Sequence, residues 1–164
     1  MTDPTSAAEA AEAEEYLTFV IGGEGYAVRI LQVREILRFE AITPVPTAPP
    51  AIRGVLNLRG RVVPVVDPAV RFGRPPSELT RLSCIIVVET EQCGERLTMG
   101  LLVDSVSQVV ELADAEIEPV PAFGSGVHVD FLRGLARQGN RFALLLDLDR
   151  VLDPVELAPE VLAA

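Results

Sequence analysis

The sequence predicts an all-β protein in which two small five-stranded barrels pack side by side, with short helical turns between strands. Three observations support this prediction. Apolar residues fall in short β-branched runs separated by glycine and proline. The composition is 49% hydrophobic but only 5% aromatic, so a sizeable core must consist mainly of aliphatic side chains. Segments of the first half of the chain also recur in the second half, which indicates an internal duplication.

The duplication shows as one offset that holds over two separate stretches. Arg53 recurs as Arg133 and Asp67 as Asp147, in both cases 80 positions later. The matches upstream of these stretches have shorter offsets, because the loops of the two copies differ in length. Each copy holds about five strands with proline-rich connections, and such a unit closes most simply into a barrel. The matched segments are 52–55 with 132–135, 61–67 with 141–147, 42–46 with 117–121, and 33–36 with 106–109.

The central hairpin of the first copy has an unusual corner. Gly60 is free to take a positive φ there, and Arg59 and Arg61 place charge beside it. Pro64 cannot donate a hydrogen bond to a neighbouring strand, so its strand is expected to be an edge or to carry a bulge. These residues can be interpreted either as a docking surface or as a solvated turn. Residues 137–140 differ from this pattern, so we expect the first copy alone to carry the charged corner.

The other elements follow in chain order. Residues 1–15 are nearly free of large apolar side chains and predict a disordered acidic tail. Residues 16–155 are expected to form one domain with two lobes, of about 16–80 and 81–155. The two lobes could also exchange strands with each other. Residues 156–164 are expected to be a loosely attached tail. Strands are expected at 16–21, at 26–30, after a turn near 31–32, and at 55–58, 62–66, 84–88, 97–103, 106–112 and 141–146, with helical turns at 50–53, 68–72 and 149–152.

Charge and hydropathy exclude several classes of partner. The net charge of −10 argues against binding to nucleic acid or to an anionic membrane surface. The arginines are concentrated in the first half of the chain, which suits an acidic protein partner. No apolar run approaches the roughly 18 residues of a membrane span, and the acidic N-terminus lacks a signal sequence. We therefore expect a soluble, cytoplasmic protein without direct membrane insertion.

Catalytic and metal-binding patterns are weak throughout the sequence. Cys84 and Cys93 match no zinc spacing, and His128 is the single histidine, so neither a metal nor a cofactor is predicted. The paired Asp67 and Asp147 suggest an aspartic protease, but neither is followed by the Thr-Gly or Ser-Gly that such a site needs; capping of the next helical turn is the expected role. The acidic run at 111, 114, 116 and 118 reads as a solvated loop, with calcium as the weaker alternative. We expect no enzymatic activity.

Several motifs together resemble the CheW-type chemotaxis coupling proteins, from about Tyr16 to Leu152. The most specific is Asn57-Leu-Arg-Gly60 ahead of the apolar strand that ends at Asp67. Pro68 departs from the family pattern, where leucine usually follows the aspartate, and the acidic tail has no counterpart. The remaining matches are Tyr26-Ala-Val-Arg-Ile30 with Val33-Arg-Glu-Ile36, Thr43-Pro-Val-Pro46, Arg53-Gly-Val-Leu56, Gly100-Leu-Leu-Val-Asp-Ser-Val106, and Leu132-Arg-Gly-Leu135.

This resemblance implies two SH3-like barrels and a non-enzymatic adaptor. Such a protein couples the cytoplasmic tip of a chemoreceptor to the regulatory domain of a CheA-type histidine kinase, and reaches membrane-associated receptor arrays through these partners. A β-barrel module that binds a peptide or ligand in another signalling pathway is the alternative. The resemblance implies kinase contacts at Val33, Glu35 and Ile36, and receptor contacts at Gly54, Asn57, Leu58, Arg59, Val103 and Val106.

Overall fold

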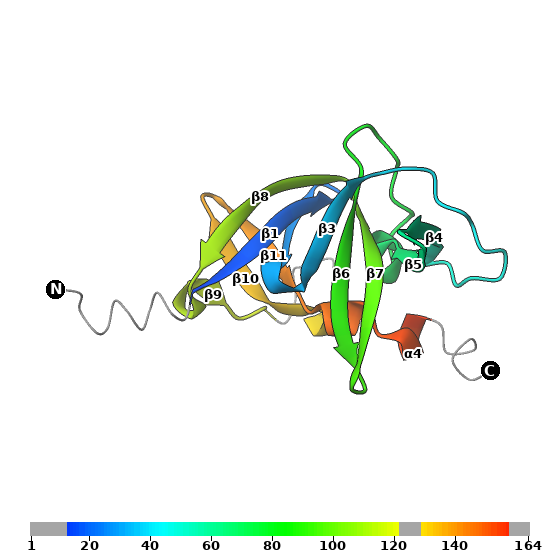
Figure 1. Ribbon diagram of the computed structural model, residues 1–164. Coiled ribbons are helices and arrows are strands. Elements are labelled where there is room, and N and C mark those ends of the chain that lie inside the picture. The colour runs from blue at the N-terminus through cyan, green and yellow to red at the C-terminus, as the bar shows by residue number, and fades with distance from the viewer. Residues whose placement is uncertain (1–12, 122–128, 158–164) are drawn as a thin grey trace.

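The protein is built from two β-sheets, each curled into a small SH3-like barrel, that lie side by side (Figure 1). The computed structural model describes residues 13–121 and 129–157. The strands are β1 (Glu14–Ile21), β2 (Glu24–Arg29), β3 (Val33–Arg38), β4 (Ile52–Leu58), β5 (Arg61–Val66), β6 (Cys84–Gln92), β7 (Glu95–Val103), β8 (Ser105–Leu112), β9 (Ile117–Glu118), β10 (Leu132–Gln138) and β11 (Arg141–Leu146). The helical turns are η1 (Ile30–Gln32), α2 (Pro68–Arg71), η2 (Asp114–Glu116), η3 (Val129–Phe131), α3 (Leu148–Val151) and α4 (Pro154–Leu157).

The two copies exchange their first hairpins. One sheet has the strand order β8-β1-β2-β11-β10-β9, and the other has the order β3-β6-β7-β5-β4. The hairpin β1–β2 of the first copy therefore pairs with β8 and β11 of the second. The hairpin β6–β7 of the second copy pairs with β3 and β5 of the first. A division of the chain near residue 80 does not coincide with these sheets. The five-stranded sheet comes from residues 33–103, and the six-stranded sheet comes from the segments before and after this range.

The duplication extends to fine detail of the backbone. The ladder between β4 and β5 shifts register between Ile52 and Gly54, and the ladder between β10 and β11 shifts at the equivalent place. The N–H of Asp67 donates to the carbonyl of Ala51 at 2.7 Å, and Asp147 makes the equivalent bond at 2.8 Å. These shared features lie at the strand ends where each copy enters its helical turn, which identifies them as scaffold.

The hairpin corners use left-handed backbone conformations. Arg59 and Gly60 connect β4 to β5 with φ values of 52° and 84°, as in a type I′ turn. The positive φ predicted at Gly60 is therefore confirmed, and the arginine before it is left-handed as well. The turn at Cys93 and Gly94 repeats this geometry between β6 and β7, with φ values of 53° and 81°.

One aliphatic core with a short aromatic stack joins the two lobes. The rings of Phe19, Tyr26, Phe72 and Phe131 follow one another with centroid distances of 6.1, 5.8 and 5.6 Å. Arg71 extends the link, because its guanidinium lies 4.5 Å from the centre of the Phe131 ring and its Nε donates to a carbonyl of α3. The two barrels thus share the main core between them, and each sheet also holds a smaller apolar cluster of its own.

Both ends of the described chain are more ordered than the sequence suggested. β1 begins at Glu14, inside the expected acidic tail, and Glu14 forms a 3.0 Å ion pair with Arg29. Pro154 starts α4, and Leu157, expected in a loose tail, is buried in the main core. Apolar burial at one end and strand pairing at the other supply the contacts that local composition does not reveal.

One local expectation in the first copy was wrong, and another holds only in part. The segment 50–53 forms a turn closed by a bond from Ile52 N–H to the Pro49 carbonyl, and no helix, because β4 starts at Ile52. Of the two alternatives for the strand of Pro64, the edge strand is wrong, since β5 lies between β4 and β7, whereas the ladder of β5 with β4 does carry a register shift, between Ile52 and Gly54. Its ladder with β7 involves only Val65 and Val66, so the missing N–H of Pro64 falls outside that ladder. Within the described residues, no helix is long and apolar enough to cross a membrane.

Candidate functional site

The predicted kinase-contact residues lie on β3, an edge strand of the five-stranded sheet. Ile36 is 44% exposed, whereas Val33 is half-buried and packs against the main core. The side chain of Glu35 is 27% exposed. This strand therefore offers an apolar side chain and a carboxylate beside an unpaired strand edge.

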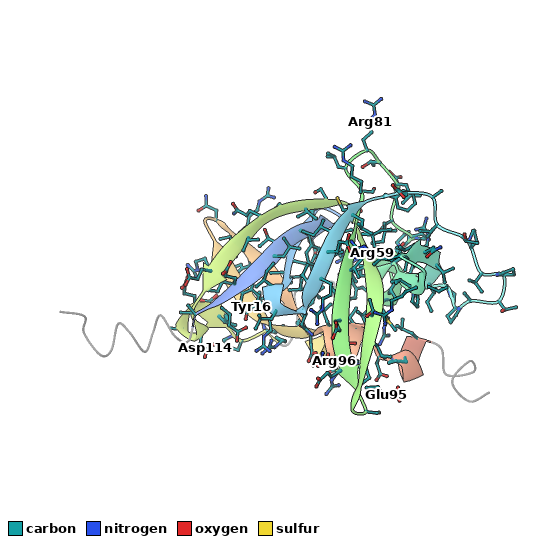
Figure 2. All side chains as sticks on the ribbon, viewed as in Figure 1. Tyr16, Arg59, Arg81, Glu95, Arg96 and Asp114 are labelled. Atoms are coloured by element: carbon teal, nitrogen blue, oxygen red, sulfur yellow. The ribbon has the colours of Figure 1, made fainter. Side chains whose placement is uncertain are left out.

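The predicted receptor-contact residues at the corner between β4 and β5 form a second surface. Asn57 is exposed, and its side-chain oxygen accepts a 2.9 Å hydrogen bond from the N–H of Gly60, which fixes the turn. Leu58 is half-buried against a small apolar cluster of the same sheet. The side chain of Arg59, labelled in Figure 2, is 76% exposed. The backbone of the corner is thus held by a hydrogen bond, and the guanidinium of Arg59 is exposed to solvent.

One ion pair connects these two surfaces. Nη2 of Arg59 donates to Oε1 of Glu35 at 2.9 Å. β3 and β4 are the two ends of the strand order in this sheet, so the pair spans the open side of the barrel. Because Arg59 is largely exposed, we expect the pair to contribute only about 0.2–1 kcal/mol to stability. The main effect of the ion pair is to fix the positions of the Glu35 carboxylate and the Arg59 guanidinium relative to each other.

A pocket of about 400 Å³ lies between the same two edge strands. Its wall includes Leu37 from β3, Leu56 and Leu58 from β4, and Ile42 from the proline-rich connection. Leu37 and Ile42 were not predicted as site residues, since nothing in their local sequence distinguishes them from core residues. Polar residues such as Asn57 line the rest of the wall, so the pocket is of mixed polarity.

Two predicted receptor-contact residues are buried and cannot offer a surface in this structure. Val103 is 0% exposed in the main core. Gly54 is also buried, and a Cβ on it would stand 2.5 Å from the carbonyl oxygen of Thr43. The glycine permits the bridge between Thr43 and Val55, which holds the proline-rich connection against β4. Val106, in contrast, is half-buried in the edge strand β8.

Asp67 is a structural carboxylate. It is 0% exposed and caps α2 by accepting from the N–H of Ala69 at 3.1 Å, as predicted. It also accepts from Arg53 at 2.8 Å and from the hydroxyl of Ser77 at 2.9 Å. This network, which was not predicted, holds the loop before β6 in place. Asp147 makes no side-chain cap bond, so the cap predicted there was wrong.

Two residues of the acidic run, Glu116 and Glu118, contact other parts of the protein. Glu116 accepts from the N–H of Ala113 at 3.1 Å, and Glu118 forms a 3.3 Å ion pair with Arg137. Across residues 13–121 and 129–157, no group of three ligating side chains could hold a metal ion. His128 lies outside the described residues.

The expectation that only the first copy carries a charged corner was wrong. Arg141 begins β11 at the second corner and is exposed, as Arg61 is at the first. Phe142, which follows it, is 43% exposed, and the guanidinium of Arg137 lies 5.4 Å from its ring centre. The second corner therefore combines cations with an exposed aromatic ring.

Comparisons with known proteins show which family shares this architecture. A family model described as the CheW-like domain matches residues 15–156. Chemotaxis protein CheW of Rhizobium meliloti is 37% identical over 142 residues, covering 87% of this chain and 89% of that protein. Chemotaxis protein CheW of Klebsiella aerogenes is 34% identical over 145 residues, covering 88% and 85%. The crystal structure of the scaffolding protein TtCheW from Thermoanaerobacter tengcongensis matches with a TM-score of 0.76 at 30% identity, covering 84% of this chain and 86% of that one. The chain belongs to the family of CheW-like chemotaxis scaffold proteins.

Proposed function

We propose that the protein is a non-enzymatic adaptor that couples the cytoplasmic tip of a chemoreceptor to the regulatory domain of a CheA-type histidine kinase. The observation that supports the proposal is the 2.9 Å ion pair between Glu35 and Arg59, since the family resemblance implies kinase contact for the first residue and receptor contact for the second. Similarity to chemotaxis proteins and to a scaffolding protein supports the same function.

On the kinase side, the contact would be made by β3. Ile36 supplies an exposed apolar side chain, and Val33 and Glu35 are half-buried next to it. Such a surface suits a partner barrel that buries an apolar residue and pairs with a carboxylate at the rim. The unpaired edge of β3 adds main-chain hydrogen-bonding groups.

On the receptor side, the contact would be made by the corner and by the start of β8. A chemoreceptor tip is a helical hairpin, which can pack apolar side chains against Leu58 and Val106. Arg59 and Asn57 can bond to a carboxylate or a free carbonyl at the turn of the hairpin. Gly54 and Val103 support this surface from within and do not touch the partner.

Calorimetric titrations with each purified partner test the proposal. Glu35→Lys is expected to weaken binding of the kinase regulatory domain, with Glu95→Lys as a control at an exposed acid of β7 (Figure 2). Arg59→Asn is expected to weaken binding of the receptor tip, with Arg81→Asn as a control in the loop before β6 (Figure 2). Equal effects of test and control variants, or no binding by the folded wild-type protein, would contradict the proposal.

A further inference from the structure

The six-stranded barrel has an apolar interior and a polar open end. Its smaller apolar cluster takes one face of each strand, and side chains on one face recur at every second residue. At the open end, the next residue on this face of five strands is polar or a glycine. These five residues, which we call the barrel mouth, are Thr18 in β1, Gly25 in β2, Gln108 in β8, Gln138 in β10 and Arg141 in β11. Each is two positions from a residue of the cluster, in the same order Tyr16, Ala27, Val110, Ala136 and Ala143.

A pocket of about 210 Å³ lies at the barrel mouth and is lined by all five of its residues. Ala143 also lines the pocket, and Arg141 is the one charged residue in its wall. Arg141 is exposed and has no ion-pair partner in the described part of the chain. The mouths of β-barrels are frequent binding sites when small apolar residues and a few polar groups line them. The barrel mouth has this composition.

The equivalent mouth of the five-stranded barrel is bridged by a salt link. Arg59 donates to Glu35 there at 2.9 Å. By the offset of the duplication, Gly139 occupies the position of Arg59 in the second copy, and Gln108 matches Glu35. The second copy therefore has neither the side chain that reaches across the mouth nor the carboxylate that receives it.

Two further replacements make room at the barrel mouth. Val63 in the first copy corresponds to Ala143 in the second. The parallel ladders of the two sheets have the same register, which makes Thr98 the counterpart of Gly25. Both changes remove side-chain atoms from the second barrel, so the pocket follows from how the two copies have diverged.

We propose that the barrel mouth binds the carboxylate group of a small organic anion. The guanidinium of Arg141 would pair with the carboxylate, which supplies the negative charge that Gln108 lacks. The side-chain amides of Gln108 and Gln138 can donate to the same oxygens, and the apolar end of the ligand would rest on Ala143. The pocket is smaller than the roughly 300–1,000 Å³ of sites for drug-sized ligands, so it suits only a small molecule. The site uses none of the residues assigned to the kinase or the receptor, so its test does not depend on the proposed function.

Titration of the isotope-labelled full chain with sodium propionate, followed by two-dimensional NMR, tests this proposal. Saturable shifts are expected for the amide signals of Gly25, Gln108 and Ala143, and sodium chloride at the same ionic strength should not reproduce them. Propionamide has a similar shape and no charge, so it should bind about tenfold more weakly or worse, since a hydrogen bond to a charged group is lost. Shifts that do not saturate, or equal binding of propionamide, would overturn the proposal.

Variants based on the duplication locate the site. Arg141→Gln should weaken propionate binding by about tenfold or more, whereas Arg61→Gln, the equivalent change at the first corner, should have no effect. Gln108→Glu combined with Gly139→Arg rebuilds the ion pair of the first copy and should abolish binding. Gly139 has a φ of 61° and open space around its Cβ position, and Arg59 adopts a φ of 52° in the first copy, so the arginine can be accommodated. Equal effects of Arg141→Gln and Arg61→Gln, or unchanged binding by the double variant, would refute this site.

Discussion

Arg59 and Glu35 are joined by a hydrogen-bonded ion pair, although Arg59 belongs to the corner after β4 and Glu35 to the opposite edge strand β3. Arg59 holds a left-handed backbone conformation, with φ at 52°. Two effects of opposite sign therefore act at this residue. The ion pair stabilises the fold slightly, and the left-handed conformation of a non-glycine residue costs about 1 kcal/mol.

Substitutions at Arg59 separate these two effects. Arg59→Ala loses the ion pair and keeps the unfavourable conformation, whereas Arg59→Asn loses the pair but tolerates the left-handed region. We expect Arg59→Asn to be more stable than Arg59→Ala by about 0.5–1 kcal/mol in urea unfolding. Equal stability of the two variants would contradict a left-handed residue at this corner.

Asp67 should be far more important for stability than Asp147. Asp67→Ala removes the acceptor for Arg53, Ser77 and Ala69 in a fully buried position. We expect a loss of about 2–4 kcal/mol in the free energy of unfolding. Asp147→Ala is the matched control, since the equivalent side chain makes no cap bond and should cost under about 1 kcal/mol. Similar costs at both positions would contradict this asymmetry.

Gly54 should tolerate no side chain. In Gly54→Ala the Cβ would meet the carbonyl oxygen of Thr43 at 2.5 Å, so the bridge between Thr43 and Val55 must open. We expect a loss of about 2–3 kcal/mol, as for other strained or overpacked positions, in urea unfolding. Gly25→Ala provides a control, because its Cβ would meet nothing closer than 3.9 Å. A neutral Gly54→Ala variant would show that the connection does not pack on β4.

Stability should depend on the protonation of Asp149. Partial desolvation, and then the nearby Asp147 and Glu91, raise the pKa of the exposed Asp149 carboxyl above its ordinary value. A raised pKa in the folded state means that this group favours folding most at acidic pH, and that the contribution is lost as pH rises through the folded-state pKa.

The isosteric variant Asp149→Asn isolates this effect. It should be more stable than the wild-type protein at neutral pH, and the difference should shrink below the pKa of an unfolded aspartate, about 3.9. Urea unfolding of both proteins at the two pH values measures the difference. Lower stability of Asp149→Asn at neutral pH would contradict the expectation.

Local sequence patterns predicted most strands, because β-branched runs and turn residues act over a few positions. The turn near residues 31–32 and the strand after it are η1 and β3, and β11 has the predicted bounds. The duplicated barrels are likewise present. The exchange of hairpins was left open for a physical reason: both copies have the same apolar pattern, so either hairpin satisfies either barrel by local criteria.

The candidate site was less predictable, since it depends on burial and on contacts between distant residues. Val103 and Val109 lie in strands that are consecutive in the chain, yet one is fully buried and the other is 47% exposed. The pair between Glu35 and Arg59 arises from barrel curvature, and the exposure of Phe142 beside the second cationic corner depends on tertiary packing. Residue type alone carries none of this information.

The exchanged hairpins also set an order for folding during synthesis. The five-stranded sheet is complete once Val103 has left the ribosome, but β1 and β2, made first, must wait for β8 and β11. Until then both edges of this first hairpin lack their strand partners, and contacts of such long sequence separation form slowly. The nascent chain therefore carries an N-terminal hairpin with unpaired edges until β8, and finally β11, has been made.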